Sequence, residues 1–221
     1  ARQILRLNDD IVAYFSDAAP SGTIRVGVPT DFSHNFLLDS IASFAASYPD
    51  VKIDIESMKS RDLRDGLGEE KLDIIAAIVP DGDVPYLVES TMVKPFWAMK
   101  DNLSLDPKAP VPMLRHPEPC EYAARMCEAL RLTDRSWRTT LVSRDVAGLQ
   151  AAVLAGVGVT ALTPMTLLPG MRVAHSDEGF PPLSPLRIGL FYKHASLDEA
   201  GHGLARYMLE QIQRAEQTDI H

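Results

Sequence analysis

An almost unbroken apolar run from Leu72 to Val79 constrains the fold of this chain more than any other feature. A strand this apolar predicts burial on both faces, which is typical of parallel sheets in α/β proteins. Segments with helical periodicity precede it at about Asn35–Tyr48 and Ser60–Gly68, and shorter strands are expected at Ile24–Val28 and Val51–Ile55. Strands that alternate with helices predict a parallel sheet with right-handed crossovers.

A second α/β series follows a proline-spaced stretch at residues 102–119. Its expected helices are Glu121–Leu130 and Asp145–Ala155, and its expected strands are Thr139–Val142, Gly158–Leu162 and Leu186–Tyr192. Strand-like sequence from Leu87 to Met99 leads into this part, and a helix over Leu197–Ala215 ends it. Two series of similar size predict two α/β lobes.

Composition excludes several classes of protein. The 221 residues carry a formal net charge of −8, which argues against binding of a nucleic-acid backbone by this chain alone. A hydrophobic content of 46% excludes disorder. No apolar run approaches the ~18 residues of a membrane span. Two cysteines cannot form a disulfide framework. The composition therefore indicates a soluble, acidic, cytoplasmic protein that is either α/β or helical.

The first 19 residues are expected to form a helix. Apolar side chains recur at alternating steps of three and four residues, at Ile4, Leu7, Ile11, Tyr14 and Ala18. This seam fits either a helix packed on its own domain or a dimerising helix. The chain opens on Ala1 without an apolar signal segment, and we interpret it as a fragment of a longer protein.

Signals for catalysis are weak. The sequence has no Gly-x-Ser-x-Gly elbow, no His-Glu-x-x-His pair and no Walker loop. Gly156-Val157-Gly158 follows a helix and precedes a strand, and we interpret it as a helix stop. Cys120 and Cys127 lie seven residues apart on one expected helix, roughly 10 Å from each other and beyond disulfide reach. We therefore predict a protein that binds rather than catalyses, with no metal and no cofactor.

Hydroxyl-bearing turns follow the expected parallel strands, where open α/β sheets bind ligands. The first lobe offers Thr30, Asp31, Phe32 and Ser33 after one strand and Ser60 after the next. The second lobe offers Ser143, Arg144 and Thr163. Helix capping alone explains any one of these hydroxyls, with Ser60 placed as a cap. Together they predict a small polar or anionic ligand between the lobes, with Arg61 or Arg144 able to bind a carboxylate.

Four ordered segments resemble the effector-binding domain of LysR-type transcriptional regulators. They are Gly22–Val28 (Gly-x-Ile-Arg-Val-Gly-Val), Ser47–Ile55 (Ser-Tyr-Pro-Asp-Val-Lys-Ile-Asp-Ile), Ser60–Ile75 and Ala147–Thr160. The resemblance covers about residues 1–217. Within the family, the short second lobe and the segment from Pro29 to His34 look most like the motility and virulence repressor subgroup.

The resemblance implies a two-lobe fold like that of type 2 periplasmic binding proteins, preceded by the linker helix over residues 1–19. It implies a first lobe of residues 20–93 and 193–217, a second lobe of residues 94–192 and a tail of residues 218–221. Two crossover strands would join the lobes near Val93–Pro95 and Tyr192–His194.

The resemblance also implies function. The expected effector contacts are Thr30–Ser33, Ser60, Val79, Phe96, Ser143, Arg144 and Thr163. The full-length protein would form a homodimer or homotetramer, through Ile4, Leu7, Ile11 and Tyr14 of the linker helix, and would bind DNA through a helix-turn-helix absent from this chain. A solute-binding protein of a transporter, which shares the fold, is the alternative.

Overall fold

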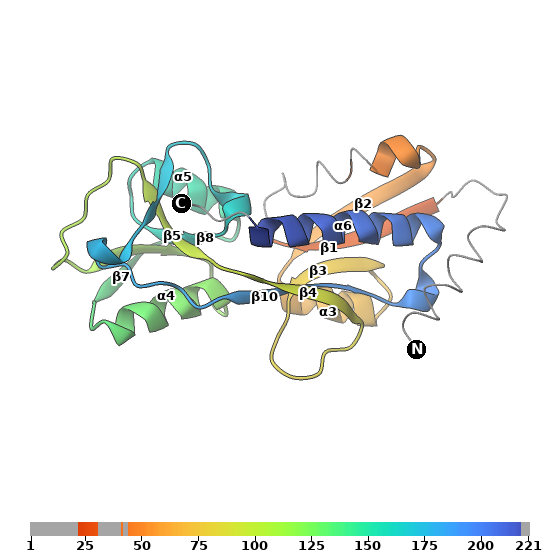
Figure 1. The fold of residues 1–221 in the computed structure, drawn as a ribbon, viewed down its shortest axis with the longest axis horizontal. Helices are drawn as coiled ribbons and strands as arrows, with labels where there is room; N and C mark the ends of the chain where they lie inside the picture. Colours follow the sequence, from red (N-terminus) through yellow and green to blue (C-terminus); the bar gives the residue numbers. More distant parts are fainter. Residues whose placement is uncertain (1–21, 31–40, 42–43, 218–221) are drawn as a thin grey trace.

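The computed structural model describes residues 22–30, 41 and 44–217 and arranges them as two lobes (Figure 1). The first lobe is built on a five-stranded sheet of order β2-β1-β3-β10-β4. Its strands are β1 (Gly22–Pro29), β2 (Val51–Met58), β3 (Ile74–Ile78), β4 (Leu87–Val93) and β10 (Leu186–Tyr192). Strands β1, β2 and β3 are parallel, and β10 runs antiparallel to both β3 and β4.

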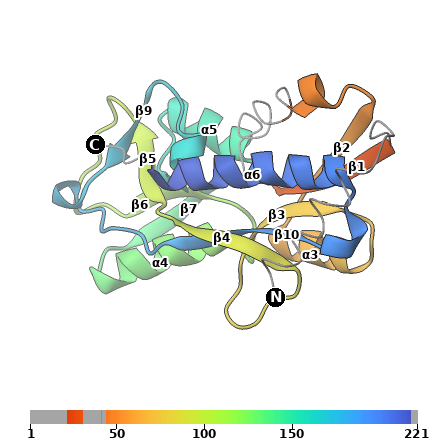
Figure 2. The same cartoon turned by 45° about the vertical axis from the view of Figure 1, so that its right-hand side comes forward.

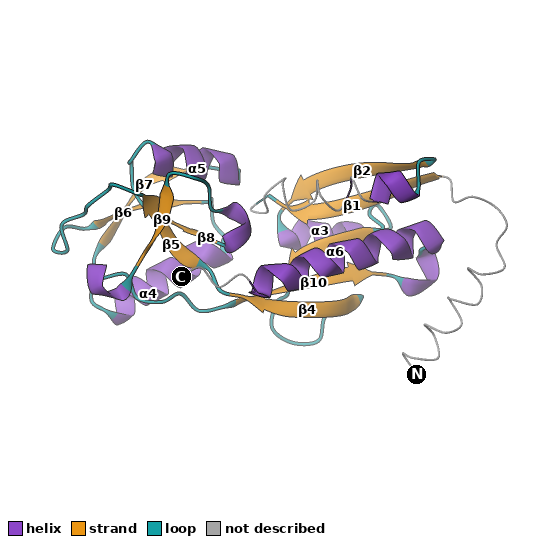
Figure 3. Cartoon of the chain, turned by 45° about the horizontal axis from the view of Figure 1, so that its top comes forward, coloured by secondary structure: helices purple, strands orange, loops and turns teal. Residues whose placement is uncertain are grey.

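Strand β3 is buried on both faces, as its apolar sequence predicts. Ile74 and Ala76 pack in a core beneath helix α6 (Glu199–Gln217). Ile75 and Ala77 point the other way, into a core formed with helix α3 (Ser60–Gly68). Figure 3 shows α6 and α3 on opposite sides of this sheet. The alternation follows from the two-residue period of a strand.

The second lobe repeats this arrangement. It contains β5 (Phe96–Lys100), β6 (Val111–Arg115), β7 (Trp137–Val142), β8 (Thr160–Leu162) and β9 (Met171–Ala174). Two backbone bonds join β6 to the start of β8: Leu114 N to Val159 O at 2.8 Å and Val159 N to Pro112 O at 2.9 Å. The order is therefore β7-β6-β8-β5-β9, with helices α4 (Glu121–Leu132) and α5 (Val146–Leu154) over separate cores.

The direction of the strands makes the two lobes face each other. Strand β4 leads into the second lobe. Strands β3 and β4 both run antiparallel to β10, so β3 runs in the same direction as β4, and so do β1 and β2, which are parallel to β3. Strand β5 leads away from the first lobe, and β8, β6 and β7 run opposite to β5. The carboxyl ends of all six parallel strands thus lie at the edges where the lobes meet.

Two segments cross between the lobes (Figure 2). The first is Lys94–Pro95, between β4 and β5, close to the crossing expected near Val93–Pro95. The second is Pro181–Pro185, before β10. The prediction of a crossing at Tyr192–His194 is wrong, because β10 pairs with β3 and β4, and residues 186–192 therefore belong to the first lobe. The apolar sequence of β10 fits either core, so its pattern could not assign the lobe.

Two strands of the second lobe were not predicted from the sequence. Strand β6 lies in the proline-spaced stretch, where Pro112 keeps its carbonyl in the sheet as the acceptor for Val159 N. Proline normally weakens a strand assignment because it lacks the N–H donor. Strand β9 has only 4 residues, too few for a clear pattern. The predicted linker helix over residues 1–19 and the tail of residues 218–221 lie outside the described residues.

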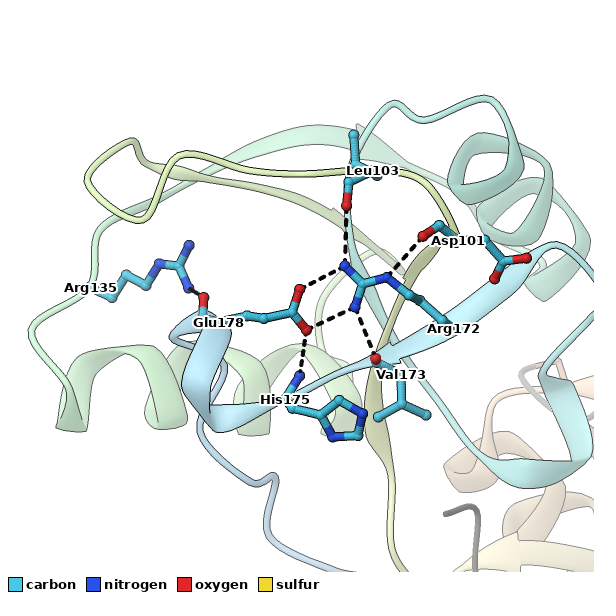
Figure 4. A network of polar contacts seen from close by, with 7 residues as sticks. All are labelled: Asp101, Leu103, Arg135, Arg172, Val173, His175 and Glu178. Carbon is cyan, nitrogen blue, oxygen red and sulfur yellow. Dashed lines mark hydrogen bonds and ion pairs between the residues drawn. The ribbon is translucent and has the colours of Figure 1, made fainter.

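A network of polar contacts holds the segment that leads to the return crossing (Figure 4). Arg172 on β9 forms a two-pronged ion pair with Glu178, at 2.8 Å and 2.6 Å. Arg172 also donates to the carbonyls of Asp101 and Leu103. Arg135 donates to the carbonyls of Glu178 and Gly179. A guanidinium has five N–H donors and can therefore bind several acceptors at once. This corner of the second lobe thus depends on two arginines.

The Arg172–Glu178 pair makes stability depend on pH. Hydrogen bonds from Arg172 lower the pKa of Glu178 to about 2. Burial disfavours the charged carboxylate and acts in the opposite direction. A carboxyl whose pKa is lowered in the folded state stabilises the protein above its unfolded pKa, and this stabilisation is lost as the pH falls toward 2. Both side chains are about one-third exposed, so we expect a coupling of only about 1 kcal/mol.

A double-mutant cycle of Arg172→Gln and Glu178→Gln tests this expectation by urea unfolding. The coupling energy should be about 1 kcal/mol at pH 6 and should decline between pH 4.5 and 2. A coupling that is constant across this range would contradict the expected titration of Glu178.

Candidate functional site

The lobes contact each other through reciprocal apolar side chains. Ile78, at the end of β3, packs against the second-lobe core that includes Trp97 and Met113. Met165, in the short helix η1 (Pro164–Thr166) after β8, packs against the first-lobe core beneath α6. The candidate site therefore lies at the strand ends on either side of this contact.

The backbone of Ile78 faces a gap between β1 and β3. Val79 N donates to Arg187 O at 2.8 Å, so the neighbouring amide and carbonyl of Ile78 point away from β10 and toward β1. Strand β1 pairs with β3 only at Val26 and Gly27, and the strands then separate. In a sheet of this order, the position between β1 and β3 is the topological switch point, where ligands bind.

Two side chains of α3 form hydrogen bonds with the backbone of Ile78. Ser60 Oγ accepts a hydrogen bond from Ile78 N at 3.1 Å. Arg64 Nη1 donates to Ile78 O at 2.7 Å. The expectation that Ser60 caps the helix is wrong, because Lys59 occupies the N-cap and Ser60 is the first helical residue. Since Ser60 Oγ acts as an acceptor here, its hydroxyl proton can be donated to a ligand.

The other first-lobe candidates differ in accessibility. Thr30 follows β1 and is half-buried, and its amide donates to Met58 O at 3.2 Å, which places it beside the chain that leads to Ser60. Val79 is only 7% exposed and packs in the core with Leu63, so its side chain points away from the switch point. Candidates Asp31, Phe32 and Ser33 lie outside the described residues.

In the second lobe, Ser143 and Arg144 follow β7 in a tight turn. Ser143 Oγ accepts from Asp145 N at 3.3 Å and donates to Asp145 O at 3.0 Å. Asp145 caps α5 by accepting from Gly148 N at 2.6 Å. The side chain of Arg144 is exposed. Ser143 therefore shapes the turn, and Arg144 remains the accessible group at this strand end.

Thr163 is buried and serves a structural network. It is 2% exposed, and its amide donates to Thr166 Oγ1 at 3.0 Å. Gln150 on α5 donates to Thr166 O at 2.7 Å. These contacts fix the short helix that carries Met165, so Thr163 positions the contact between lobes. Phe96 is half-buried at the start of β5, where it packs on the core beneath α5.

Two residues at these strand ends were not among the predicted contacts. Arg64 lies one turn after Ser60 on α3, and the spacing of four residues places both on one face of a helix. His116 follows β6, and its Nδ1 lies 3.0 Å from Ser143 O. For Arg64 the helical period was the available signal, whereas His116 follows a strand that the sequence did not predict.

Electrostatics distinguish the arginines of α3. Burial lowers the pKa of Arg64, with the charge of Asp65 acting in the opposite direction and that of Arg61 in the same direction. Arg61 is exposed. Arg61 and Arg144 were expected to bind a carboxylate, but neither is held in the gap between β1 and β3. Arg64 lies there instead.

The described residues offer little for other chemistry. No group of three or more His, Cys, Asp or Glu side chains among them could hold a metal ion. Cys120 occupies the N-cap of α4, and burial raises the pKa of the Cys127 thiol, which disfavours its reactive thiolate. None of the helices described is both long and apolar enough to cross a membrane.

Comparison with known families now identifies the chain. Residues 17–213 match the family described as the LysR substrate binding domain. The chain belongs to this family. The match confirms the resemblance seen in the four sequence segments and, with the model, the two-lobe fold expected from it. The expected subgroup is not tested by this match and stays a prediction.

Two curated relatives are transcriptional regulators. This LysR domain is 25% identical over 187 residues to the HTH-type transcriptional regulator PecT of Dickeya dadantii (strain 3937), covering 85% of the chain and 59% of PecT. It is 26% identical over 192 residues to the HTH-type transcriptional regulator DgdR of Burkholderia cepacia, covering 86% of the chain and 64% of DgdR. The chain thus spans about six-tenths of the length of these relatives.

Solved regulatory domains share the fold. The apo regulatory domain of HypT from Salmonella typhimurium matches with a TM-score of 0.68 and 15% identity, covering 90% of this chain and 99% of that one. The reduced regulatory domain of OxyR2 from Vibrio vulnificus matches with a TM-score of 0.62 and 18% identity, covering 89% and 99%. At such identities the likeness concerns the fold alone.

Proposed function

We propose that this LysR domain senses a small polar or anionic metabolite between its lobes and transmits binding to the rest of a transcriptional regulator. One observation carries the proposal: the carboxyl ends of six parallel strands, three from each lobe, face one another. Ligands of open α/β sheets bind at such ends. The chain then acts by binding rather than by catalysis.

Binding between lobes offers a physical route to regulation. A ligand that contacts both lobes favours the arrangement in which both sets of contacts form, and it shifts the population by its difference in affinity for the two arrangements. The contacts of Ile78 and Met165 join the lobes and would be the first to respond. That the curated relatives are regulators favours a sensor over the transporter alternative.

The partners of the whole protein are part of the same proposal. We infer a cytoplasmic homodimer or homotetramer that binds DNA through a helix-turn-helix outside this chain. The predicted dimerisation residues Ile4, Leu7, Ile11 and Tyr14 lie outside the described residues and stay a prediction. Light scattering across a range of concentrations measures the assembly, and a chain that stays monomeric throughout would contradict this inference.

Ser60→Ala tests the site. A thermal-shift screen of amino acids, sugars, dicarboxylates and aromatic acids first selects a compound that stabilises the chain, and calorimetry then measures its affinity. Ser60→Ala should weaken binding about tenfold through loss of one donor to the ligand. Thr30→Val should weaken it as well. Some loss of fold stability is expected for Ser60→Ala, because Ile78 N loses its acceptor.

Ser104→Ala is the matched control, since this exposed serine lies in the loop after β5. It should leave affinity unchanged. If both Ser60→Ala and Thr30→Val bind the selected compound as the wild type does, the ligand does not occupy the proposed site.

A further inference from the structure

We propose that the ligand of this site is an anion bearing a carboxylate or similar oxoanion, and that Arg64 supplies the opposing charge. The inference rests on the proposed function, because it takes the space between the lobes as the binding site. It goes further by naming the chemical class of the ligand and the residue that selects it.

Arg64 and Ser60 lie at the switch point of the sheet. Ile78 directs its amide and carbonyl into the gap between β1 and β3, and Arg64 reaches that carbonyl at 2.7 Å. Ser60 accepts a hydrogen bond from the amide of the same residue at 3.1 Å. The guanidinium and the hydroxyl therefore lie beside each other on the edge of β3 that faces β1, at the switch point of the sheet.

The charge of Arg64 is not neutralised by an ion pair among the described residues. In the part of the chain that the structure describes, Arg64 forms no ion pair, and its hydrogen bond goes to the neutral carbonyl of Ile78. A guanidinium has five N–H donors in a planar fork that matches a carboxylate. One bond to a carbonyl leaves most of this fork unused.

The surroundings of Arg64 disfavour its charged form. Burial lowers its pKa; the charge of Asp65 opposes this shift, and that of Arg61 adds to it. A partly buried cation that forms no ion pair is costly. An anion bound by the guanidinium would reduce this cost.

Arg135 is also half-buried, and burial lowers its pKa as well. It binds the carbonyls of Glu178 and Gly179 and lies 4.5 Å from the centre of the Phe180 ring. Its Nε is buried without a hydrogen-bond partner among the described residues, so Arg135 is itself only partly satisfied. Its contacts lie within the second lobe, away from the strand ends, whereas Arg64 lies at the switch point of the sheet.

Matched pairs of acids and amides test the proposal: malonate with malonamide, succinate with succinamide, and benzoate with benzamide. Each pair has a similar shape and differs in charge. At constant ionic strength, we expect the wild-type chain to bind at least one carboxylate about tenfold more tightly than its amide. Arg64→Gln should weaken binding of that carboxylate about tenfold or more and leave binding of the amide unchanged.

Arg61→Gln is the control, because it removes the same charge from an exposed position on the same helix. It should change the affinity for the carboxylate less than about twofold. Circular dichroism checks that Arg64→Gln folds. Arg64→Lys keeps the charge without the fork and should bind the carboxylate several-fold less tightly than the wild type, so it tests the same contact if Arg64→Gln does not fold.

Three results would overturn the proposal: no carboxylate binds the wild type, acid and amide bind alike, or Arg64→Gln binds the carboxylate unchanged. If Ser60→Ala still weakens binding in those cases, the site between the lobes stands and only the anion assignment fails. If Ser60→Ala and Thr30→Val have no effect on any bound probe, the proposed function itself fails.

Discussion

Gly158→Ala is expected to destabilise the chain by about 3 kcal/mol or more, because a side chain here would collide with backbone rather than with a flexible neighbour. A Cβ atom at Gly158 would lie 2.1 Å from Pro112 O. That oxygen accepts the bond from Val159 N that joins β6 to β8. Alanine must therefore separate the two strands on which the second-lobe sheet depends, and folded domains have only about 5–15 kcal/mol of stability.

Gly68→Ala is the control for this prediction. Gly68 ends α3, and a Cβ there would meet no atom within 4 Å. Alanine should be neutral or should stabilise by up to about 1 kcal/mol, because it reduces the freedom of the unfolded chain. Urea unfolding followed by circular dichroism measures both variants. A Gly158→Ala protein within about 0.5 kcal/mol of the wild type would show that the strands can separate without cost.

The two glycines of Gly156-Val157-Gly158 show what a local pattern can and cannot predict. The sequence indicated a helix stop, and Gly156 confirms it with a φ of +76° directly after α5. The role of Gly158 depends on Pro112, which lies 46 positions away in a strand that was not predicted because of its prolines. A close approach between two distant segments cannot be predicted from the local pattern of a single sequence.

The same distinction applies to the fold. Alternation of strands and helices predicted both lobes and the burial of β3, because periodicity reflects which faces a segment must bury. It could not assign β10, whose apolar residues suit either core. That assignment depends on antiparallel pairing with β3 and β4, which is a property of the assembled sheet.

For the candidate site, the strand ends were predictable and the side-chain roles were not. Ser60 lies at the expected end, but its hydroxyl binds Ile78 N instead of capping its own helix. Thr163 lies at an expected end and is buried in a structural network. Arg61 was expected to bind an anion, yet Arg64 occupies the gap because β1 and β3 separate there. Such roles depend on how two strands diverge.

Trp97→Ala is the second large effect that we expect, at about 3–5 kcal/mol. Trp97 is 1% exposed at the start of β5, just after the first crossing. Its Nε1 donates to Pro181 O at 2.8 Å, in the second crossing, and its ring centre lies 5.3 Å from that of Phe180. Trp97 thus binds the start of the second crossing from a position two residues after the first. Trp97→Phe, which keeps most of the ring, should still cost about 1–3 kcal/mol because Pro181 O loses its donor.

Trp137→Phe is the matched control, since the chain has only two tryptophans and Trp137 is 37% exposed on the edge strand β7. It should change stability by less than about 0.5 kcal/mol. In this variant Trp97 is the only tryptophan, so its fluorescence reports on the second-lobe core around it, and urea should shift its emission to longer wavelength as that core unfolds. If Trp97→Phe were no more destabilising than Trp137→Phe, the hydrogen bond to Pro181 would not hold the crossings together. A tryptophan signal that changes well below the unfolding transition would instead mean that the second-lobe core around Trp97 loosens before the chain unfolds.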